Sequence, residues 1–314
     1  MTPLPLGKLP PTLLAQMLSQ APSSDPRVIV GPGMGMDCAV VDLGQTCLVF
    51  KSDPITFASD QIGWYTVHVN VNDIATTGAQ PRWMLVTALL PEGKTSSETV
   101  ETISQQLYQV CEKMDISVIG GHTEITHGLD RPILVGTLIG DVARENLITP
   151  KGASVGDAIL LSGGVPIEGT AILAREFPHR LQNTLSPDEL EQAKAYLNKP
   201  GISVLPQAQM AAKTGAVTAM HDPTEGGLAG ALWELAEACG HSLVIQPENV
   251  IVSPLSKKIC AAFGIDPLAT IASGALLLTV KPNSVDEVLD ALEAESIPCA
   301  QIGQVEESPV QVRQ

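Results

Sequence analysis

Several carboxylates lie where predicted strands and helices begin or end, and these residues are the best suited to chemistry. Asp37 opens one predicted strand, Asp53 closes the next, and Asp222 follows a third. Side chains at element ends cluster readily when a chain folds, and carboxylates that converge without matching Lys or Arg need a cation between them. Each Asp alone is equally well explained as a cap or turn residue. Together they predict a Mg²⁺ site that bridges to a phosphate group.

The segment "HVNVNDIATTGAQP", His68 to Pro81, places further polar groups among aliphatic residues. Two amides and one carboxylate, those of Asn70, Asn72 and Asp73, lie among valines and an isoleucine. Burying such groups is costly unless a partner satisfies them. The segment therefore predicts that Asn72 and Asp73 belong to the same polar cluster as the other carboxylates.

Hydrophobic periodicity leaves the conformation of this segment open. Val67, Val69 and Val71 alternate as in a strand, whereas the longer set Trp64, Val67, Val71, Ile74 and Gly78 is spaced as on one face of a helix. We favour the helix because residues 82–90, "RWMLVTALL", already supply a strand. Its expected ends are the following residues: Ser59 or Asp60 as the cap, and Gly78 as the stop.

Two glycine pairs precede or follow polar residues in ways that suit ligand binding. In "HDPTEGGLAGALWELAEACG", Gly226 and Gly227 would let backbone amides approach a ligand at the positive end of a helix. In "GGHTE", Gly120 and Gly121 predict a tight turn. That turn would present the polar residues that follow it, which are His122, Thr123 and Glu124.

Three other motifs fail on inspection. "PEGKTS" at 91–96 lacks the first glycine of a P-loop, because Ala88 stands in its place. "GPGMGM" at 31–36 has Met36 where a dinucleotide fingerprint needs its third glycine. "HTEITH" at 122–127 has the wrong spacing for a zinc-binding HExxH helix.

Composition sets the class of protein and excludes some partners. The 314 residues are 44% hydrophobic and 17% charged, which indicates a globular chain long enough for two domains. A formal charge of -16 argues against a nucleic-acid partner, which requires clustered Lys and Arg. It does not argue against a nucleotide, because Mg²⁺ held by carboxylates can neutralise a triphosphate.

The cysteines and the hydrophobic runs suggest a cellular compartment. The 6 cysteines show no CxxC and no ladder of short spacings, so we expect small core residues in a reducing compartment. No run of about 18 apolar residues is present, and prolines interrupt the N-terminus where a secretory signal needs an unbroken apolar core. We therefore expect a cytoplasmic protein with no membrane partner.

Alternation and helical spacing outline the rest of the chain. Residues 38–53 predict a hairpin, 96–114 a helix, and 116–121 and 132–140 strands. Pro, Gly, Lys and Ser concentrate near residue 150, where we expect a domain boundary. The expected units are an N-terminal extension at 1–28, a first domain at 29–150 and a second domain at 151–314. In the second domain we expect a strand at 157–163, helices through 170–215, a strand at 216–222 and a helix at 226–240.

The ordered set of these motifs resembles a known superfamily over nearly the whole chain. The motifs are "MDCAVV", "SDP", "NVNDIATTGAQP", "GGHTE", "HDPTEGGLAGAL" and "ASGALLLTV", spread from residue 36 to 280. They resemble the PurM-like superfamily, which includes aminoimidazole ribonucleotide synthetase, thiamine-monophosphate kinase, selenophosphate synthetase and the hydrogenase maturation factor HypE. The segment "DPTEGGLAGALWELAEA" is most similar to the HypE branch.

The resemblance implies an α+β protein of two domains that binds ATP through Mg²⁺. The N-terminal α+β domain would hold ATP and metal and pair with a second subunit to form a homodimer, and the C-terminal domain would be α/β. The implied metal ligands are Asp37, Asp53 and Asp73. The implied nucleotide-site residues are Asn72, Asp73, Gly120, Gly121, His122, Thr123, Asp222, Gly226 and Gly227. No catalytic residue can be named.

The sequence also departs from the HypE pattern. Met36 replaces one acid of the family's glycine-acid-acid signature, Glu225 replaces an Arg, and His122 replaces an acid, as in selenophosphate synthetases. The chain ends "VEESPVQVRQ" and so lacks the terminal Cys that carries the carbamoyl group in HypE; its last cysteine is Cys299.

Three functions are consistent with these motifs. The first is an ATP- and Mg²⁺-dependent phosphoryl-transfer enzyme of the HypE-like branch that acts on an unidentified small molecule or carrier group. The others are a phosphotransferase like thiamine-monophosphate kinase, and a nucleotide-binding assembly or regulatory protein without catalysis. Glu168 and Gly169, after "LSGGVP", are candidates for the second-substrate site, although Glu168 is equally placed to be an ordinary acid at a helix N-terminus.

Overall fold

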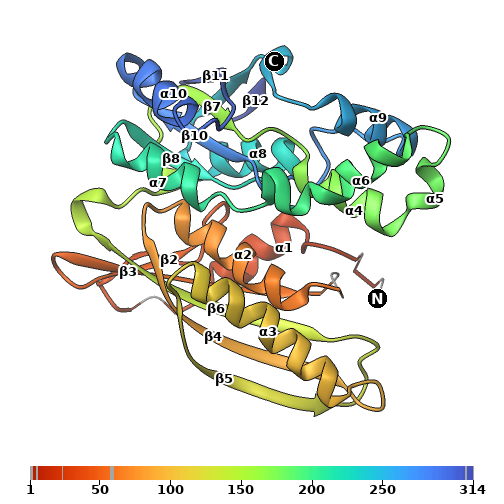
Figure 1. Cartoon of the computed structure of the whole chain (residues 1–314). Helices are drawn as coiled ribbons and strands as arrows, with labels where there is room; N and C mark the ends of the chain where they lie inside the picture. The colour runs from red at the N-terminus through yellow and green to blue at the C-terminus, as the bar shows by residue number, and fades with distance from the viewer. Residues whose placement is uncertain (1–2, 5, 23, 57–59, 308–309, 314) are drawn as a thin grey trace.

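The structure, a computed structural model, describes residues 3–4, 6–22, 24–56, 60–307 and 310–313. In this part of the chain, two six-stranded sheets organise the fold, with order β1-β2-β3-β6-β4-β5 in the first and β12-β9-β11-β7-β10-β8 in the second. Figure 1 shows the first sheet and its helices below the second. The expected two-domain α+β architecture is thereby confirmed.

The first sheet is a mixed sheet with helices on one face (Figure 1). Its strands are β1 Val28–Val30, β2 Ala39–Asp42, β3 Thr46–Ile55, β4 Gln80–Pro91, β5 Ser117–Thr126 and β6 Ile133–Ala143. The predicted hairpin is confirmed as the antiparallel pair β2 and β3. The predicted helix at 96–114 is also confirmed, as α3 Ser97–Lys113 capped by the side chain of Ser96.

The ambiguous segment is a helix, α2 Ile62–Ala75. Val67, Val71 and Ile74 are fully buried, which is the pattern that favoured a helix. The predicted cap at Asp60 is wrong: Gln61 occupies the N-cap position, and the Asp60 carboxylate instead pairs with Arg175. The alternative cap, Ser59, lies outside the described residues. The helix ends at Ala75, just before Gly78 turns the chain with a φ of 75°.

The second sheet is built from antiparallel pairs, apart from the parallel pair β12 and β9. Its strands are β7 Ala158–Ser162, β8 Val217–His221, β9 Ser242–Ile245, β10 Leu276–Val280, β11 Cys299–Glu306 and β12 Val312–Arg313. Its helices are α4 Ile167–Glu176, α5 Pro178–Leu181, α6 Pro187–Ala195, α7 Leu205–Lys213, α8 Gly227–Cys239, α9 Pro254–Phe263 and α10 Val285–Glu293. A further helix, α1 Pro11–Leu18, precedes the first sheet.

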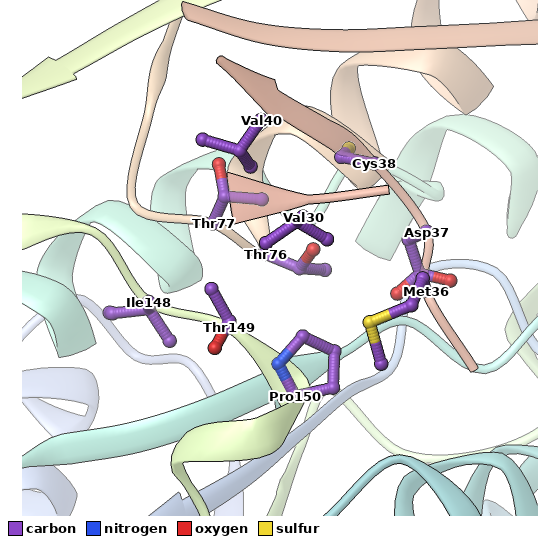
Figure 2. Close-up of a pocket in the computed structure, with 10 residues that line it drawn as sticks. All are labelled: Val30, Met36, Asp37, Cys38, Val40, Thr76, Thr77, Ile148, Thr149 and Pro150. Atoms are coloured by element: carbon purple, nitrogen blue, oxygen red, sulfur yellow. The ribbon is translucent and has the colours of Figure 1, made fainter. Parts of the chain in front are cut away.

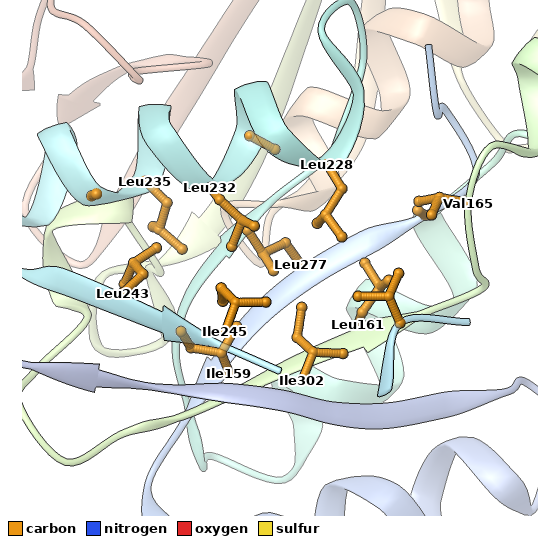
Figure 3. Packing of buried hydrophobic residues seen from close by; sticks show 14 of the residues in the cluster. Ile159, Leu161, Val165, Leu228, Leu232, Leu235, Leu243, Ile245, Leu277 and Ile302 are labelled. Atoms are coloured by element: carbon orange, nitrogen blue, oxygen red, sulfur yellow. The ribbon is translucent and has the colours of Figure 1, made fainter. Parts of the chain in front are cut away.

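Helix α8 anchors one face of the second sheet through the apolar stripe that its spacing predicts. Leu228, Leu232 and Leu235 are buried and belong to one hydrophobic cluster with strand residues such as Leu161 and Leu277 (Figure 3). Removing a side chain of this size from water stabilises a fold by roughly 1.5–3 kcal/mol. The packing fixes where the N-terminus of α8, and therefore the chain around Asp222, lies.

The predicted turn at "GGHTE" is wrong, because β5 continues without a break from Ser117 to Thr126. Parallel pairing with β4 extends to Pro91 opposite Thr126, so the strand has a partner along its whole length. Gly121 is needed for close approach rather than for a turn: a Cβ atom there would lie 1.9 Å from the Val86 carbonyl oxygen.

Among the described residues, no helix has the length and apolar character needed to cross a membrane. The cysteine thiols are free, and Cys38, Cys47, Cys111 and Cys260 are buried. The expectation that cysteines act as small core residues is confirmed for these four.

Candidate functional site

The predicted carboxylates converge where the two sheets meet. Asp37 lies in the loop before β2, Asp53 lies near the end of β3, and Asp73 lies on α2. From the second sheet, Asp222 follows β8 directly. Burial is the largest cause that raises the pKa of Asp73, and the charges of Asp222, Asp53 and Asp37 raise it further, as closely spaced carboxylates do. We call these four residues the acidic cluster.

One side of the acidic cluster is occupied by a lysine. The Lys51 ammonium lies 3.0 Å from Asp73 Oδ1 and 3.3 Å from Asp53 Oδ2. Burial lowers the pKa of Lys51, but the charges of Asp73 and Asp53 outweigh this effect and hold it well above its usual value. Lys51 is therefore a permanent cation between two carboxylates.

The other side is organised by a buried histidine. His221 Nδ1 lies 2.6 Å from Asp37 Oδ2, and His221 Nε2 lies 3.0 Å from Glu234 Oε2 on α8. Burial lowers the pKa of His221, but the Asp37 and Glu234 carboxylates raise it well above its usual value. The ring is therefore an imidazolium that donates from both nitrogens, and it has no lone pair left for a metal.

Asp222 is the least satisfied member of the acidic cluster. It is 2% exposed, and its Oδ1 atom has no hydrogen-bond partner within the described part of the chain. Burial, followed by repulsion from Asp37, raises its pKa to about 7. A buried carboxylate without a partner is costly, so this oxygen requires a ligand or a proton.

Charge balance and donor chemistry fit a divalent cation. The acidic cluster and Glu234 supply five carboxylates, whereas Lys51 and His221 supply two positive charges. Carboxylate oxygens are the ligands that Mg²⁺ prefers. Ligand atoms of Asp37, His221 and Asp222 lie within 4.8 Å of one another, but His221 is already bonded on both sides. The residues that fit the ion are therefore aspartates.

The amides of α2 are satisfied by the protein itself. Asn72 donates from Nδ2 to the Ile202 carbonyl at 2.7 Å and accepts from the Val204 amide at 2.9 Å, so it joins α2 to the second domain. Asn70 accepts from the Asp53 amide at 3.0 Å and donates to the Thr66 carbonyl at 2.9 Å. Asn72 was predicted to line a nucleotide site, whereas its observed contacts hold the two domains together.

Replacing Asn72 by alanine should therefore destabilise the junction between the domains. The change leaves a buried carbonyl and a buried amide without partners, and each unsatisfied group costs about 1–3 kcal/mol of stability. We expect the free energy of unfolding in urea to fall by about 3 kcal/mol. The exposed Asn183, changed to alanine in the same way, serves as the control and should be neutral. Equal stability of the two variants would contradict the bridging role.

The glycine pair at α8 serves mainly to pack the loop. Gly226 takes a φ of 91° at the N-cap, and a Cβ atom on Gly227 would lie 2.6 Å from the carbonyl oxygens of Leu268 and Thr270. Two amides at the start of the helix are already used: Gly227 donates to Thr224, and Ala229 donates to Leu268. The predicted anion site at this helix N-terminus is therefore largely filled by the protein's own carbonyls.

The segment Gly120 to Thr123 lies apart from the acidic cluster. Asp53 pairs with Gly136, Gly136 with Val86, and Val86 with Gly121, so these residues form one row across the sheet. Three interstrand spacings place Gly121 about 14 Å from Asp53, far beyond the roughly 2.1 Å of a Mg²⁺–oxygen bond. His122 is exposed and contacts Glu124 at 3.2 Å. This segment does not share a metal ion with the cluster of the same chain.

Glu168, the candidate for the second substrate, is a buried acid in the first turn of α4. It is 5% exposed, and its Oε2 atom has no partner among the described residues. Burial raises its pKa to about 7, opposed by hydrogen bonding to Ser273. The next residue, Gly169, packs closely against Thr270: a Cβ atom added to Gly169 would lie 2.5 Å from Thr270 Cγ2.

Two pockets lie beside Met36, and Asp37 lines the smaller of them. The smaller has a volume of only about 10 Å³ and is lined by residues such as Cys38, Thr76 and Pro150 (Figure 2). The larger, of about 510 Å³, is lined by the glycine-containing loop 31–34, by Lys151 and by Glu237 of α8. Met36 borders both. Only the larger has the size typical of ligand sites, roughly 300–1,000 Å³.

The sequence analysis missed three residues of the site. Lys51 lies two positions before Asp53, and residues i and i+2 of a strand share one face, so a lysine in an apolar strand was a usable signal. His221 directly precedes Asp222, but no role was predicted for it. Glu234 lies on the polar side of α8, and the sequence gives no sign that it would contact His221.

Comparison with known proteins places this architecture in a family. A family model described as "AIR synthase related protein, N-terminal domain" matches residues 35–142, and the corresponding C-terminal model matches residues 154–314. The chain belongs to the AIR synthase related protein family. The resemblance drawn from the motifs is thereby confirmed.

The sequences that are similar to this chain include a hydrogenase expression/formation protein and HypE. A putative hydrogenase expression/formation protein of Methanocaldococcus jannaschii is 30% identical over 84% of this chain and 78% of its own length. Carbamoyl dehydratase HypE of Bradyrhizobium diazoefficiens is 28% identical over 84% of this chain and 75% of its own length.

Solved structures of the same fold include nucleotide complexes. HypE in complex with ATP superposes with a TM-score of 0.71 at 22% identity, covering 95% of this chain and 83% of that chain. A ThiL protein complexed with AMPPCP and TMP gives a TM-score of 0.73 at 22% identity, covering 96% and 91%. At these identities the likeness shows that the AIR synthase related fold is shared.

Proposed function

We propose that this protein is an ATP- and Mg²⁺-dependent phosphoryl-transfer enzyme of the HypE-like branch, acting on a small molecule or carrier group. The observation that carries the proposal is the acidic cluster, in which carboxylates outnumber the cations and the buried Asp222 keeps an unbonded oxygen. The family relatives named HypE and the fold shared with an ATP complex support the choice of nucleotide.

The proposed roles follow from where each group lies. Asp37, Asp53 and Asp73, with Asp222 as a fourth carboxylate, would hold Mg²⁺, which neutralises charge on the transferred phosphoryl group when bound. The pocket of about 510 Å³ that Met36 borders, next to Asp37 in the sequence, has room for the nucleotide. His221 holds Asp37 in place.

A direct assay tests the proposal. Purified protein should bind ATP in the presence of Mg²⁺ and release ADP when supplied with a pooled metabolite extract, and EDTA should abolish the release. Thiamine monophosphate supplied alone tests the kinase alternative. Absence of ADP release under all of these conditions would overturn the enzymatic proposal.

A second function is favoured by one particular observation. Lys51 neutralises part of the acidic cluster, and Met36 stands where the family pattern has an acid, so the site carries less negative charge for metal ions than that pattern implies. These features suit a nucleotide-binding assembly or regulatory protein. ATP binding with no turnover would give this function the lead.

We also propose that the protein is a homodimer in which the edge strand β5 is covered. Every residue from Ser117 to Ile125 is exposed, including the apolar side chains of Val118, Ile119 and Ile125. An exposed apolar edge strand readily pairs with another chain. Such pairing would remove His122 and its neighbours from solvent and place them at a subunit interface.

A charge introduced on β5 should disrupt this dimer. Ile119 is 54% exposed, and its replacement by lysine would place a charge at the proposed interface. We expect sedimentation analysis to give a dimer for the wild type and a monomer for Ile119→Lys. Val155, 53% exposed on the second domain, provides the matched control, and Val155→Lys should remain dimeric. A monomeric wild type would refute the proposal.

A further inference from the structure

Lys51 occupies a position that an unpaired lysine would avoid. Its side chain is 16% exposed, and its ammonium contacts carboxylate oxygens of both Asp73 and Asp53. A buried ammonium remains charged only when carboxylates surround it. Lys51 is therefore part of the charge balance of the acidic cluster and cannot be treated as a surface lysine.

On the other side of the cluster, His221 bonds one oxygen of Asp37, but a carboxylate oxygen of Asp222 keeps no partner among the described residues. Asp222 Oδ1 is buried, and a carboxylate oxygen of Asp37 lies within 4.8 Å of a carboxylate oxygen of Asp222. The acidic cluster is thus divided in two. Lys51 balances the side of Asp53 and Asp73, and the side of Asp37 and Asp222 remains open to a ligand.

We infer that Lys51 is a resident cation that fills, between Asp53 and Asp73, the position of a second divalent ion. The protein would then load a single Mg²⁺ or Mn²⁺ ion, at Asp37 and Asp222 with the remaining oxygen of Asp73. The ion and the ammonium cannot share the same oxygens, because Mg²⁺ demands near-octahedral contacts at about 2.1 Å. Displacing Lys51 would also leave a buried ammonium without partners, which is costly.

This inference rests on the proposed function only in that a divalent ion is expected at the cluster. It deepens that proposal by setting the number of ions and by naming the residue that limits it, and it narrows the ligand set by assigning Asp53 to Lys51 rather than to the ion. It also assigns a fixed positive charge close to the ion, and this charge would add to the stabilisation of a bound phosphate.

The test is a Mn²⁺ titration without nucleotide, with free Mn²⁺ followed by its electron paramagnetic resonance signal. The wild type should bind one equivalent. Lys51→Met removes the ammonium at nearly constant length and should bind two. Lys51→Arg keeps the charge and should bind one, and so should Lys257→Met, a control at an exposed lysine. The inference is overturned if the wild type binds two ions or none, or if folded Lys51→Met still binds one.

Thermal unfolding in EDTA and in Mn²⁺ accompanies the titration. Lys51→Met should unfold at a lower temperature in EDTA, because its buried carboxylates lose a partner, and Mn²⁺ should raise its melting temperature more than that of the wild type. An equal rise in the two proteins would oppose the inference. If Lys51→Met does not fold, the wild-type stoichiometry alone still decides between one ion and two.

Failure of this inference can be told from failure of the proposed function. The titration contains no nucleotide, so its stoichiometry does not depend on turnover. A correct ion count with no ADP release would overturn the phosphotransferase and leave the role of Lys51 standing. ADP release with two ions in the wild type would do the reverse.

Discussion

Replacing Asp73 by alanine should lower Mg²⁺-dependent ADP release at least about a hundredfold. Asp73 is 5% exposed and lies at the centre of the acidic cluster, where it contacts Lys51 and is close to Asp222. Removing one member of such a charge-stabilising group costs about 3 kcal/mol of transition-state stabilisation or more. The measurement is the rate of ADP release at saturating ATP and Mg²⁺.

The matched control for this prediction is Asp290→Ala on α10. Asp290 is exposed and belongs to the second domain, away from the junction, so its variant should release ADP at the wild-type rate. Circular dichroism must show that both variants are folded. A folded Asp73→Ala protein with undiminished, still Mg²⁺-dependent turnover would show that the acidic cluster is not the reaction site.

The Asp222→Asn variant should be more stable than the wild type above neutral pH when metal is absent. Burial and repulsion from Asp37 raise the pKa of Asp222 from 3.8 to about 7, so its charged form is disfavoured in the folded protein. At roughly 1.4 kcal/mol per pKa unit, the upper limit of this effect is about 4 kcal/mol. We expect a gain of about 2 kcal/mol in the free energy of unfolding at pH 8 in EDTA.

The sign of this effect follows from proton linkage. Between pH 4 and 7 the folded wild type holds a proton on Asp222 that the unfolded chain has released, so folding stability falls as the pH rises through this range. Asparagine does not titrate. The difference in stability between the variant and the wild type should therefore grow from pH 5 to pH 8.

Urea unfolding of both proteins at pH 5 and pH 8 measures this difference. Added Mg²⁺ should reverse it at pH 8, because the ion stabilises only the protein that keeps the carboxylate. Asp290→Asn controls for the loss of one negative charge at an exposed site. A difference that stays constant with pH, or one that Mg²⁺ does not reverse, would show that Asp222 is satisfied within the protein.

Local patterns predicted the elements that carry the site, because those patterns reflect burial. Val67, Val71 and Ile74 are spaced for one face of a helix, and all three are buried on α2. The aspartates could be grouped because each lies at or near the end of an element, where the chain passes from the core to the junction. The convergence of Asp37, Asp73 and Asp222 depends on both sheets, so spacing could suggest it but could not establish it.

Sequence reasoning could not predict the features that depend on tertiary contacts. The glycines at 120 and 121 read locally as a turn, but pairing with β4 overrides that preference and draws the segment into β5. The contact between Lys51 and Asp73 could not be predicted locally, because the two residues lie on different elements. The contact between His221 and Glu234 likewise depends on how α8 packs on its sheet.

Asn72 and Asp73 are consecutive residues on α2, and this gives the junction between the domains a particular property. The Asn72 side chain hydrogen-bonds to the backbone of the second domain, and the Asp73 side chain belongs to the acidic cluster. A displacement of the second domain that breaks the hydrogen bonds of Asn72 must therefore also shift the carboxylate of Asp73. A binding partner that separates the two domains would lower the affinity of the protein for the ion. By linkage, a bound ion would lower the affinity of the protein for such a partner.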